Sequence, residues 1–186
     1  MARNEIRNLT LAAMFLAIGY ILPFLVMQMP PMAMMFLPMH LPVFLCGLIC
    51  GWKYGGAVGF VLPITRSAIF GMPAMFPMAI SMSFELAVYG LVVGIVFELV
   101  RKQNLFSLYL SIIIAMVAGR ITWGLAMWVL LTFGEGAFSL QWFITGALVN
   151  AWPGIVLQLV LIPTVMIILN RVGLVNFRKN SATAQA

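Results

Sequence analysis

The chain carries very little charge. Charged residues make up 8% of its 186 residues, whereas hydrophobic residues make up 64%. A soluble domain typically has about 25% charged and roughly 45–50% apolar residues. The composition therefore excludes an ordinary soluble domain and predicts an all-α integral membrane protein. A membrane-spanning helix needs about 20 apolar residues, so the length allows about six spans and no large soluble domain.

Residues that usually perform catalysis are also scarce, with four acidic residues, one histidine and two cysteines. The sequence has no His-Glu-x-x-His pair, no Gly-x-Ser-x-Gly elbow and no phosphate-binding loop with its lysine. Cys46 and Cys50 share a helix face, but His40 does not complete a metal site with them. We therefore predict no catalytic residue, no metal and no cofactor, and interpret the cysteines as packing residues.

What the chain has in quantity is long apolar segments. We predict one compact bundle of six transmembrane helices over residues 1–186, without a cleavable signal peptide. Short turns are expected at Trp52–Tyr54 and at Gly134–Gly136, and a loop at Gly71–Pro77. The six predicted spans are residues 9–26, 38–51, 54–70, 78–100, 105–133 and 142–169.

The positive charges predict the topology. Eight of the ten Lys and Arg residues lie at alternate ends of the predicted segments, so six spans place them all on one side. By the positive-inside rule, both termini are expected to be cytoplasmic. The charges are scattered rather than clustered on one face, which argues against a nucleic-acid partner. These eight residues are Arg3, Arg7, Lys53, Arg101, Lys102, Arg171, Arg178 and Lys179.

Small residues indicate how the helices pack. Glycines recur every four residues in the second and third segments, at Gly47, Gly51, Gly55 and Gly59. Gly90 and Gly94 repeat this spacing in the fourth segment. Such spacing lets helix backbones approach closely, so we expect tight packing there.

Three charged residues lie inside apolar segments, where a charge costs about 2.5–3.5 kcal/mol on insertion scales. At 1.5 Å per residue, Arg66 lies roughly 6 Å, Glu85 roughly 12 Å and Arg120 about 20 Å below the outer end. Asn150 is expected near the depth of Glu85, and His40 close to the outer mouth. These polar residues converge on the outer half of the bundle and predict a binding site there.

Helical spacing places Met and aromatic side chains beside these polar groups, as in many small-molecule sites. Two interpretations of several residues stay open. Arg120 and Glu85 neutralise each other, contact a ligand, or do both; Arg66 holds an anionic ligand group or extends to lipid headgroups. Asn150 and the Met stripes are also explained by helix packing alone. The predicted substrate-binding residues are His40, Arg66, Glu85, Tyr89, Arg120, Trp123 and Asn150.

At this point the chain resembles the S components, the substrate-binding membrane subunits of energy-coupling factor (ECF) vitamin transporters. The first helix carries Ala13-Met14-Phe15-Leu16-Ala17, which is similar to the Ala-x-x-x-Ala docking motif of that family. The resemblance implies a six-helix protein of the prokaryotic cytoplasmic membrane that captures a vitamin from outside. It also implies docking through Ala13 and Ala17 onto a transmembrane coupling subunit with two ATPases. The S component would topple on docking, and ATP hydrolysis by the ATPases would drive release inward.

The stretch Pro38-Met39-His40-Leu41-Pro42, the following glycines, Arg66 and Gly71-Met72-Pro73 look most like the pantothenate-type branch. Pyridoxine, hydroxymethylpyrimidine, niacin and a queuosine precursor remain alternative substrates. Three other classes compete with this interpretation. A standalone carrier would transport without ATPases, a structural protein would use its polar residues only for packing, and an intramembrane enzyme would need a base beside a nucleophile.

Overall fold

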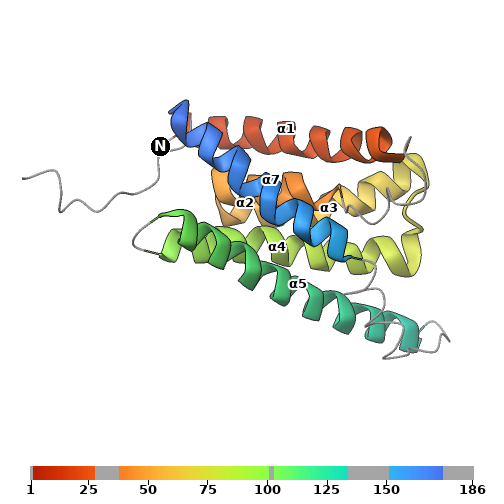
Figure 1. Ribbon diagram of the computed structural model, residues 1–186. Helices are drawn as coiled ribbons and strands as arrows, with labels where there is room; N and C mark the ends of the chain where they lie inside the picture. Colours follow the sequence, from red (N-terminus) through yellow and green to blue (C-terminus); the bar gives the residue numbers. More distant parts are fainter. Residues whose placement is uncertain (1, 28–37, 101–102, 134–150, 174–186) are drawn as a thin grey trace, which may run out of the picture.

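The computed structural model describes residues 2–27, 38–100, 103–133 and 151–173 and forms a bundle of helices (Figure 1). Within these residues there is no β-strand, so the predicted all-α fold is confirmed. A one-turn π-helix, η2, leads directly into α4. The elements are α1 (Ala2–Met27), α2 (His40–Cys50), α3 (Trp52–Phe70), η2 (Met75–Ala79), α4 (Ile80–Leu99), α5 (Leu105–Phe133) and α7 (Trp152–Arg171).

Four helical stretches of the described chain are long and apolar enough to cross a membrane: Glu5–Leu25, Met75–Leu99, Leu105–Thr132 and Trp152–Arg171. The predicted spans at 38–51 and 54–70 are not among them. Helix α2 has 11 residues and rises about 16 Å, which is shorter than a hydrocarbon core of about 30 Å. Helix α3 is long enough, but Lys53, Arg66 and its glycines make it less apolar.

Two predicted turns need correction. The turn between α2 and α3 is Gly51 alone, with φ of 93°, a backbone conformation that glycine adopts without strain. Trp52 and Lys53 already belong to α3, because Gly51 reverses the chain in one residue. In the predicted loop 71–77 a single helical turn, η2, already starts at Met75, although Phe76 within it has extended backbone angles (φ −114°, ψ 135°), so regular helix begins only after Phe76. The predicted turn at 134–136 lies outside the described residues.

Close packing of α2, α3 and α4 forms the centre of the bundle, as the glycine spacing predicted. A Cβ atom added to Gly59 would lie 2.2 Å from the carbonyl oxygen of Leu86. One added to Gly90 would lie 2.2 Å from the backbone of Gly55, and one added to Gly47 would lie 2.6 Å from the oxygen of Gly90. These distances are too short for any side chain, so the glycines are what allow the three backbones to touch.

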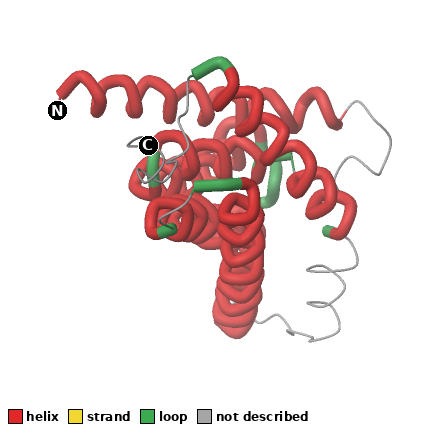
Figure 2. The backbone as a smooth tube through the Cα atoms, turned by 60° about the vertical axis from the view of Figure 1, so that its left-hand side comes forward, coloured by secondary structure: helices red, strands yellow, loops and turns green. Residues whose placement is uncertain are grey.

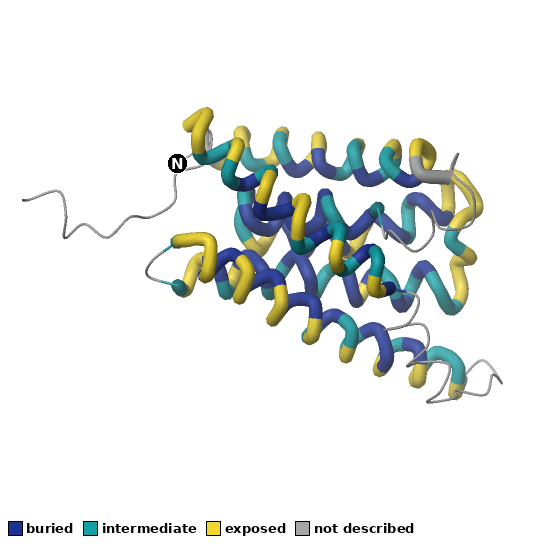
Figure 3. Tube along the Cα trace, viewed as in Figure 1, coloured by how far each residue is buried: buried dark blue, intermediate teal, exposed yellow. Residues whose placement is uncertain are grey.

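The remaining helices surround this centre. Helix α1 covers α2 and α3, α5 packs along α4, and α7 lies against α2 and α5 (Figures 1 and 2). The inward faces are buried and the outward faces are apolar but exposed (Figure 3). On α5, for example, Ile113, Val117, Ile121 and Leu125 are exposed at four-residue spacing. A continuous apolar outer stripe is what a helix presents to lipid.

Apart from Arg66 and Arg120, the basic residues that the structure describes gather at one end of the bundle. Arg7 lies in the first turns of α1, Lys53 begins α3 and Arg171 ends α7. The start of α1, the end of α4 and the end of α7 lie together at the left of Figure 1, and Trp52 borders the same surface cavity as Leu99. The charges are therefore sorted along the bundle axis. The assignment of this end to the cytoplasm stays a prediction.

Candidate functional site

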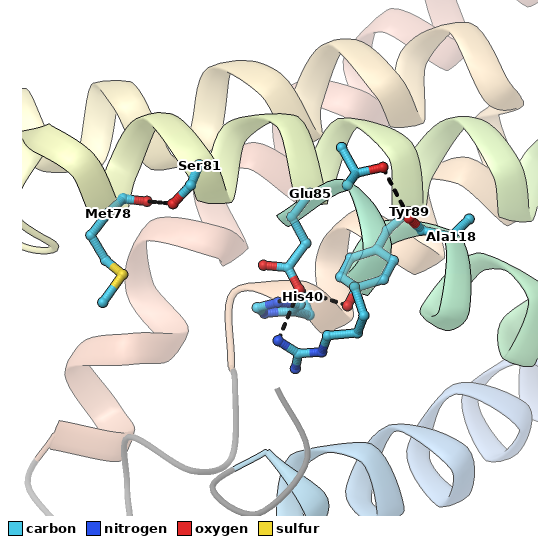
Figure 4. Close-up of polar contacts among 8 residues, drawn as sticks. His40, Met78, Ser81, Glu85, Tyr89 and Ala118 are labelled. Atoms are coloured by element: carbon cyan, nitrogen blue, oxygen red, sulfur yellow. Dashed lines mark hydrogen bonds and ion pairs between the residues drawn. The ribbon is translucent and has the colours of Figure 1, made fainter. Parts of the chain in front are cut away.

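A cluster of polar side chains is centred on Glu85, inside the bundle. Nη1 of Arg120 lies 3.0 Å from Oε1 of Glu85, and the hydroxyl of Tyr89 donates a 2.7 Å hydrogen bond to the same oxygen (Figure 4). Nε2 of His40 lies 3.8 Å from this oxygen. Glu85 and His40 are each only 1% exposed. Helices α2, α4 and α5 thus bring together the predicted residues His40, Glu85, Tyr89 and Arg120.

Helix geometry explains how these side chains meet. Glu85 and Tyr89 are one turn apart on α4, so they point to the same side. The Tyr89 ring fits against α5 because Gly119 has no side chain: a Cβ there would lie 2.3 Å from the ring. On its other side the ring contacts Phe44 and His40 of α2, with centroid distances of 4.9 Å and 5.4 Å. Tyr89 therefore holds α2 and α5 at a fixed separation.

The position of His40 corrects one expectation. The sequence analysis placed His40 close to the outer mouth. Because α2 is short, its first residue instead lies level with Glu85, the sixth residue of α4. Neither ring nitrogen of His40 has a hydrogen-bond partner within the described part of the chain. The imidazole is therefore beside the carboxylate, but its hydrogen-bonding atoms are unused.

The charges in the cluster balance. Arg120 and Glu85 form the ion pair that was one of the two interpretations of these residues. A lone carboxylate inside a membrane protein would be strongly unfavourable, and a paired guanidinium offsets that cost. The formal charges of this pair cancel, and Tyr89 and His40 add hydrogen-bonding atoms beside it. The cluster suits an uncharged polar group better than an additional carboxylate.

Arg66 lies apart from this cluster, against α1. Its guanidinium carbon is 5.2 Å from the centre of the Phe24 ring and 5.9 Å from that of Phe70, within the range of cation–π contacts. Next to it, the Tyr20 hydroxyl and the Thr65 hydroxyl are 2.6 Å apart and link α1 to α3. Arg66 is only 3% exposed, which argues against the interpretation that it extends to lipid headgroups.

Trp123 belongs to a smaller apolar cluster. It is buried with Met127 on α5 and packs with Met78 near the start of α4. Met116 belongs to the main core and Met82 packs against it, as the packing interpretation of the Met stripes predicts. Trp128 and Trp152 are exposed, as expected for interface anchors. Asn150 and Trp142 lie outside the described residues.

The sequence argument missed Gln158. This residue of α7 is 2% exposed, and its Nε2 atom has no hydrogen-bond partner in the described structure. A glutamine inside an apolar segment was the available signal, but its neutral side chain did not stand out as the charged residues did. Its burial became visible only when α7 was placed against α2 and α5.

Two further searches of the described residues help to delimit the site. No group of three or more His, Cys, Asp or Glu side chains there is arranged to hold a metal ion. A surface cavity of about 610 Å³ lies at the opposite end of α4 from η2, lined by Trp52, Ile95, Glu98, Leu99 and Gln103. The polar cluster does not border this cavity. The cluster is the candidate site because it brings buried charged and hydrogen-bonding side chains together.

The fold and the site define a class, that of an all-α membrane protein with a charge-balanced polar cluster inside its bundle. The family described as "ECF transporter, substrate-specific component" matches residues 7–166. The chain belongs to this family of transporter components, which are not enzymes. Membership implies a small-molecule substrate and an ECF module with a transmembrane coupling subunit and ATPases. No curated protein and no solved structure shows significant similarity to the chain.

Proposed function

We propose that this chain is the high-affinity substrate-binding subunit of an ECF-type ABC importer for a vitamin, with pantothenate as the preferred substrate. The observation that carries the proposal is the buried His40 side chain, whose two nitrogens lack hydrogen-bond partners in the described residues. Buried polar groups are usually hydrogen-bonded, because leaving them without a partner is costly. A hydroxyl or amide group of the substrate would supply the missing partner.

Two separated sites would bind the two ends of pantothenate. Gly59 packs directly on Leu86, the neighbour of Glu85, and Arg66 follows Gly59 by seven residues on α3. Arg66 therefore lies about 9 Å further along the bundle axis than Glu85. Extended pantothenate spans roughly 11 Å from hydroxyl to carboxylate at ordinary bond lengths. Its carboxylate would bind Arg66, and its hydroxyls would bind the neutral cluster around Glu85.

The distance between Arg66 and the Glu85 cluster also argues against the other candidate vitamins. Pyridoxine, hydroxymethylpyrimidine and niacin are single six-membered rings with short substituents, so they are too short to reach both groups. A queuosine precursor has hydrogen-bonding groups that suit the Glu85 cluster but no carboxylate for Arg66. Pantothenate has both features, together with a gem-dimethyl carbon that suits aromatic and Met side chains.

Transport would follow from docking rather than from chemistry in this chain. Ala13 and Ala17 are both exposed on α1, four residues apart, and form a flat face where another helix can approach. We propose that this face docks on the coupling subunit. The protein would capture the vitamin from outside with both termini in the cytoplasm. It would then topple in the membrane, and ATP hydrolysis by the two partner ATPases would drive release inward.

The test is identification of the ligand. The detergent-purified protein is denatured, and any released small molecule is identified by mass spectrometry. Pantothenate binding to the emptied protein is then measured by calorimetry. We expect His40→Ala to weaken binding at least tenfold, whereas Cys50→Ala, a buried change at the far end of α2, leaves it unchanged. A different released vitamin would replace pantothenate, and rapid flux in liposomes without ATPases would indicate a standalone carrier.

A further inference from the structure

One face of α7 carries a polar side chain in a row of apolar ones. Gly154, Gln158, Ile162 and Met166 are buried at four-residue spacing, so they form the inward stripe of this helix. Ile162 and Met166 belong to the main apolar core together with Phe44 of α2 and Ile112 of α5. Gln158 lies one turn beyond Ile162, towards the start of α7.

The position of Gln158 relates it to the polar cluster. Helices α2 and α7 both run in the direction opposite to α1, α3 and α5 (Figure 1). His40 is the first residue of α2, and Gln158 lies about 9 Å after the first residue of α7. Helix α7 packs against α2 and α5, the helices that carry His40 and Arg120. Gln158 thus extends inward from a helix that packs against both of these helices.

The hydrogen-bonding state of Gln158 indicates a ligand. Its Nε2 atom is buried and has no partner among the described residues, although the amide group carries two N–H donors. Gln158 and His40 are both 1–2% exposed and both have unused hydrogen-bonding atoms, on two helices in contact. If this position served packing alone, methionine would fill the same space without leaving a buried donor unsatisfied. The buried amide therefore indicates a hydrogen-bonding role.

We propose that Gln158 is a specificity-determining residue that donates a hydrogen bond from Nε2 to a neutral acceptor oxygen of the substrate. This inference rests on the proposed function, because it takes the Glu85 cluster as the substrate site. In pantothenate the acceptor is the amide carbonyl oxygen, in the middle of the molecule. His40 and Glu85 bind the hydroxyl end, and Gln158 selects for the carbonyl group that follows it.

The test uses the full chain with Gln158→Met, which keeps the volume and removes both donors. Pantothenate binding and the unfolding temperature of the ligand-free protein are measured for this variant and for Ile162→Val, a buried control one turn away. We expect about five- to tenfold weaker binding for Gln158→Met, the effect of one lost hydrogen bond, with no fall in unfolding temperature. Ile162→Val should lower the unfolding temperature and leave affinity unchanged.

A thioamide analogue of pantothenate adds a second readout, because sulfur is a weaker acceptor than the carbonyl oxygen. The wild type should bind it about five- to tenfold more weakly than pantothenate, and Gln158→Met should show little preference. If His40→Ala weakens binding but Gln158→Met does not, the inferred role of Gln158 is wrong, whereas the proposed substrate site at the Glu85 cluster is supported. If neither variant affects binding, or the wild type does not bind pantothenate, the proposed site or substrate is wrong as well.

Discussion

The Tyr89 hydroxyl and the Arg120 guanidinium both contact the same carboxylate oxygen of Glu85, at 2.7 Å and 3.0 Å. This arrangement links α5 to α4 at mid-bundle through one acidic side chain. Arg120 balances the charge of Glu85 and ties α5 to α4, whereas Tyr89 donates a hydrogen bond to Glu85 within α4. The two contributions can be separated by experiment, because one contact is ionic and the other is a hydrogen bond within α4.

Removal of the cation should destabilise the protein strongly. Arg120→Met leaves Glu85 buried without its counter-charge, and breaking such a pair typically costs about 3–5 kcal/mol. The double variant Arg120→Met/Glu85→Gln removes both charges and should recover much of this loss. Unfolding in detergent, followed by intrinsic fluorescence, measures both effects. Arg171→Met, at the exposed end of α7, is the control, and equal stability of the single and double variants would contradict the ion pair.

Removal of the Tyr89 hydroxyl should have a smaller effect. Tyr89→Phe keeps the ring between Phe44 and Gly119 and loses only the hydrogen bond to a charged acceptor, worth about 1.5–3 kcal/mol. The expected result is a modest loss of stability in the same unfolding assay. Tyr109→Phe, on the exposed face of α5, serves as a matched control. A loss as large as that of Arg120→Met would mean that the ring position had changed.

Arg66 should distinguish a carboxylate from an alcohol. Arg66→Met keeps a long side chain but removes the cation, so pantothenate binding should fall about ten- to hundredfold, as for a charged hydrogen-bonded contact. Pantothenol, which has a hydroxyl in place of the carboxylate, should bind the variant and the wild type with similar affinity. Calorimetry with both ligands gives the comparison. An equal loss for the two ligands would assign Arg66 to the packing of α1 on α3.

The exposed face of α1 should affect transport and not binding. Ala13→Leu and Ala17→Leu add bulk where a partner helix is expected to dock, so capture by the coupling module should be lost while pantothenate affinity is retained. Co-purification with the module and calorimetry measure the two properties. Ile21→Met, an exposed change near the end of the same helix, is the control. Normal co-purification of the leucine variants would place the docking surface elsewhere.

The glycine contacts should be essential to folding. Gly59→Ala places a methyl group against the backbone of Leu86, and neither backbone can move without separating α3 from α4. Overpacking of this kind typically costs about 1–3 kcal/mol or more. Ala57→Val, two residues away on the exposed side of α3, should be tolerated. Thermal unfolding of the two variants tests the difference, and similar stability would contradict the close approach.

Composition, periodicity and spacing predicted the fold class, the central helix contacts and two of the buried charged residues. The apolar segments gave an all-α membrane fold, because few other structures satisfy backbone hydrogen bonds in lipid. The glycine spacing predicted the contact of α2, α3 and α4, because close approach needs small residues at helical spacing. The presence of charge inside apolar segments identified Glu85 and Arg120 as a possible pair, since a buried charge needs a partner whatever the detailed packing.

Tertiary structure decided what depends on the relative height of helices. His40 faces Glu85 only because α2 is short and begins inside the bundle, and no local pattern reports where a helix begins along its neighbours. Arg66 lies against Phe24 of α1 and Phe70 of its own helix, apart from the Glu85 cluster, although the sequence analysis placed all three charged residues in one outer site. Gln158 became a candidate only through burial. Sequence sets which groups must be paired, whereas packing sets which groups meet, because contacts between helices depend on three-dimensional register.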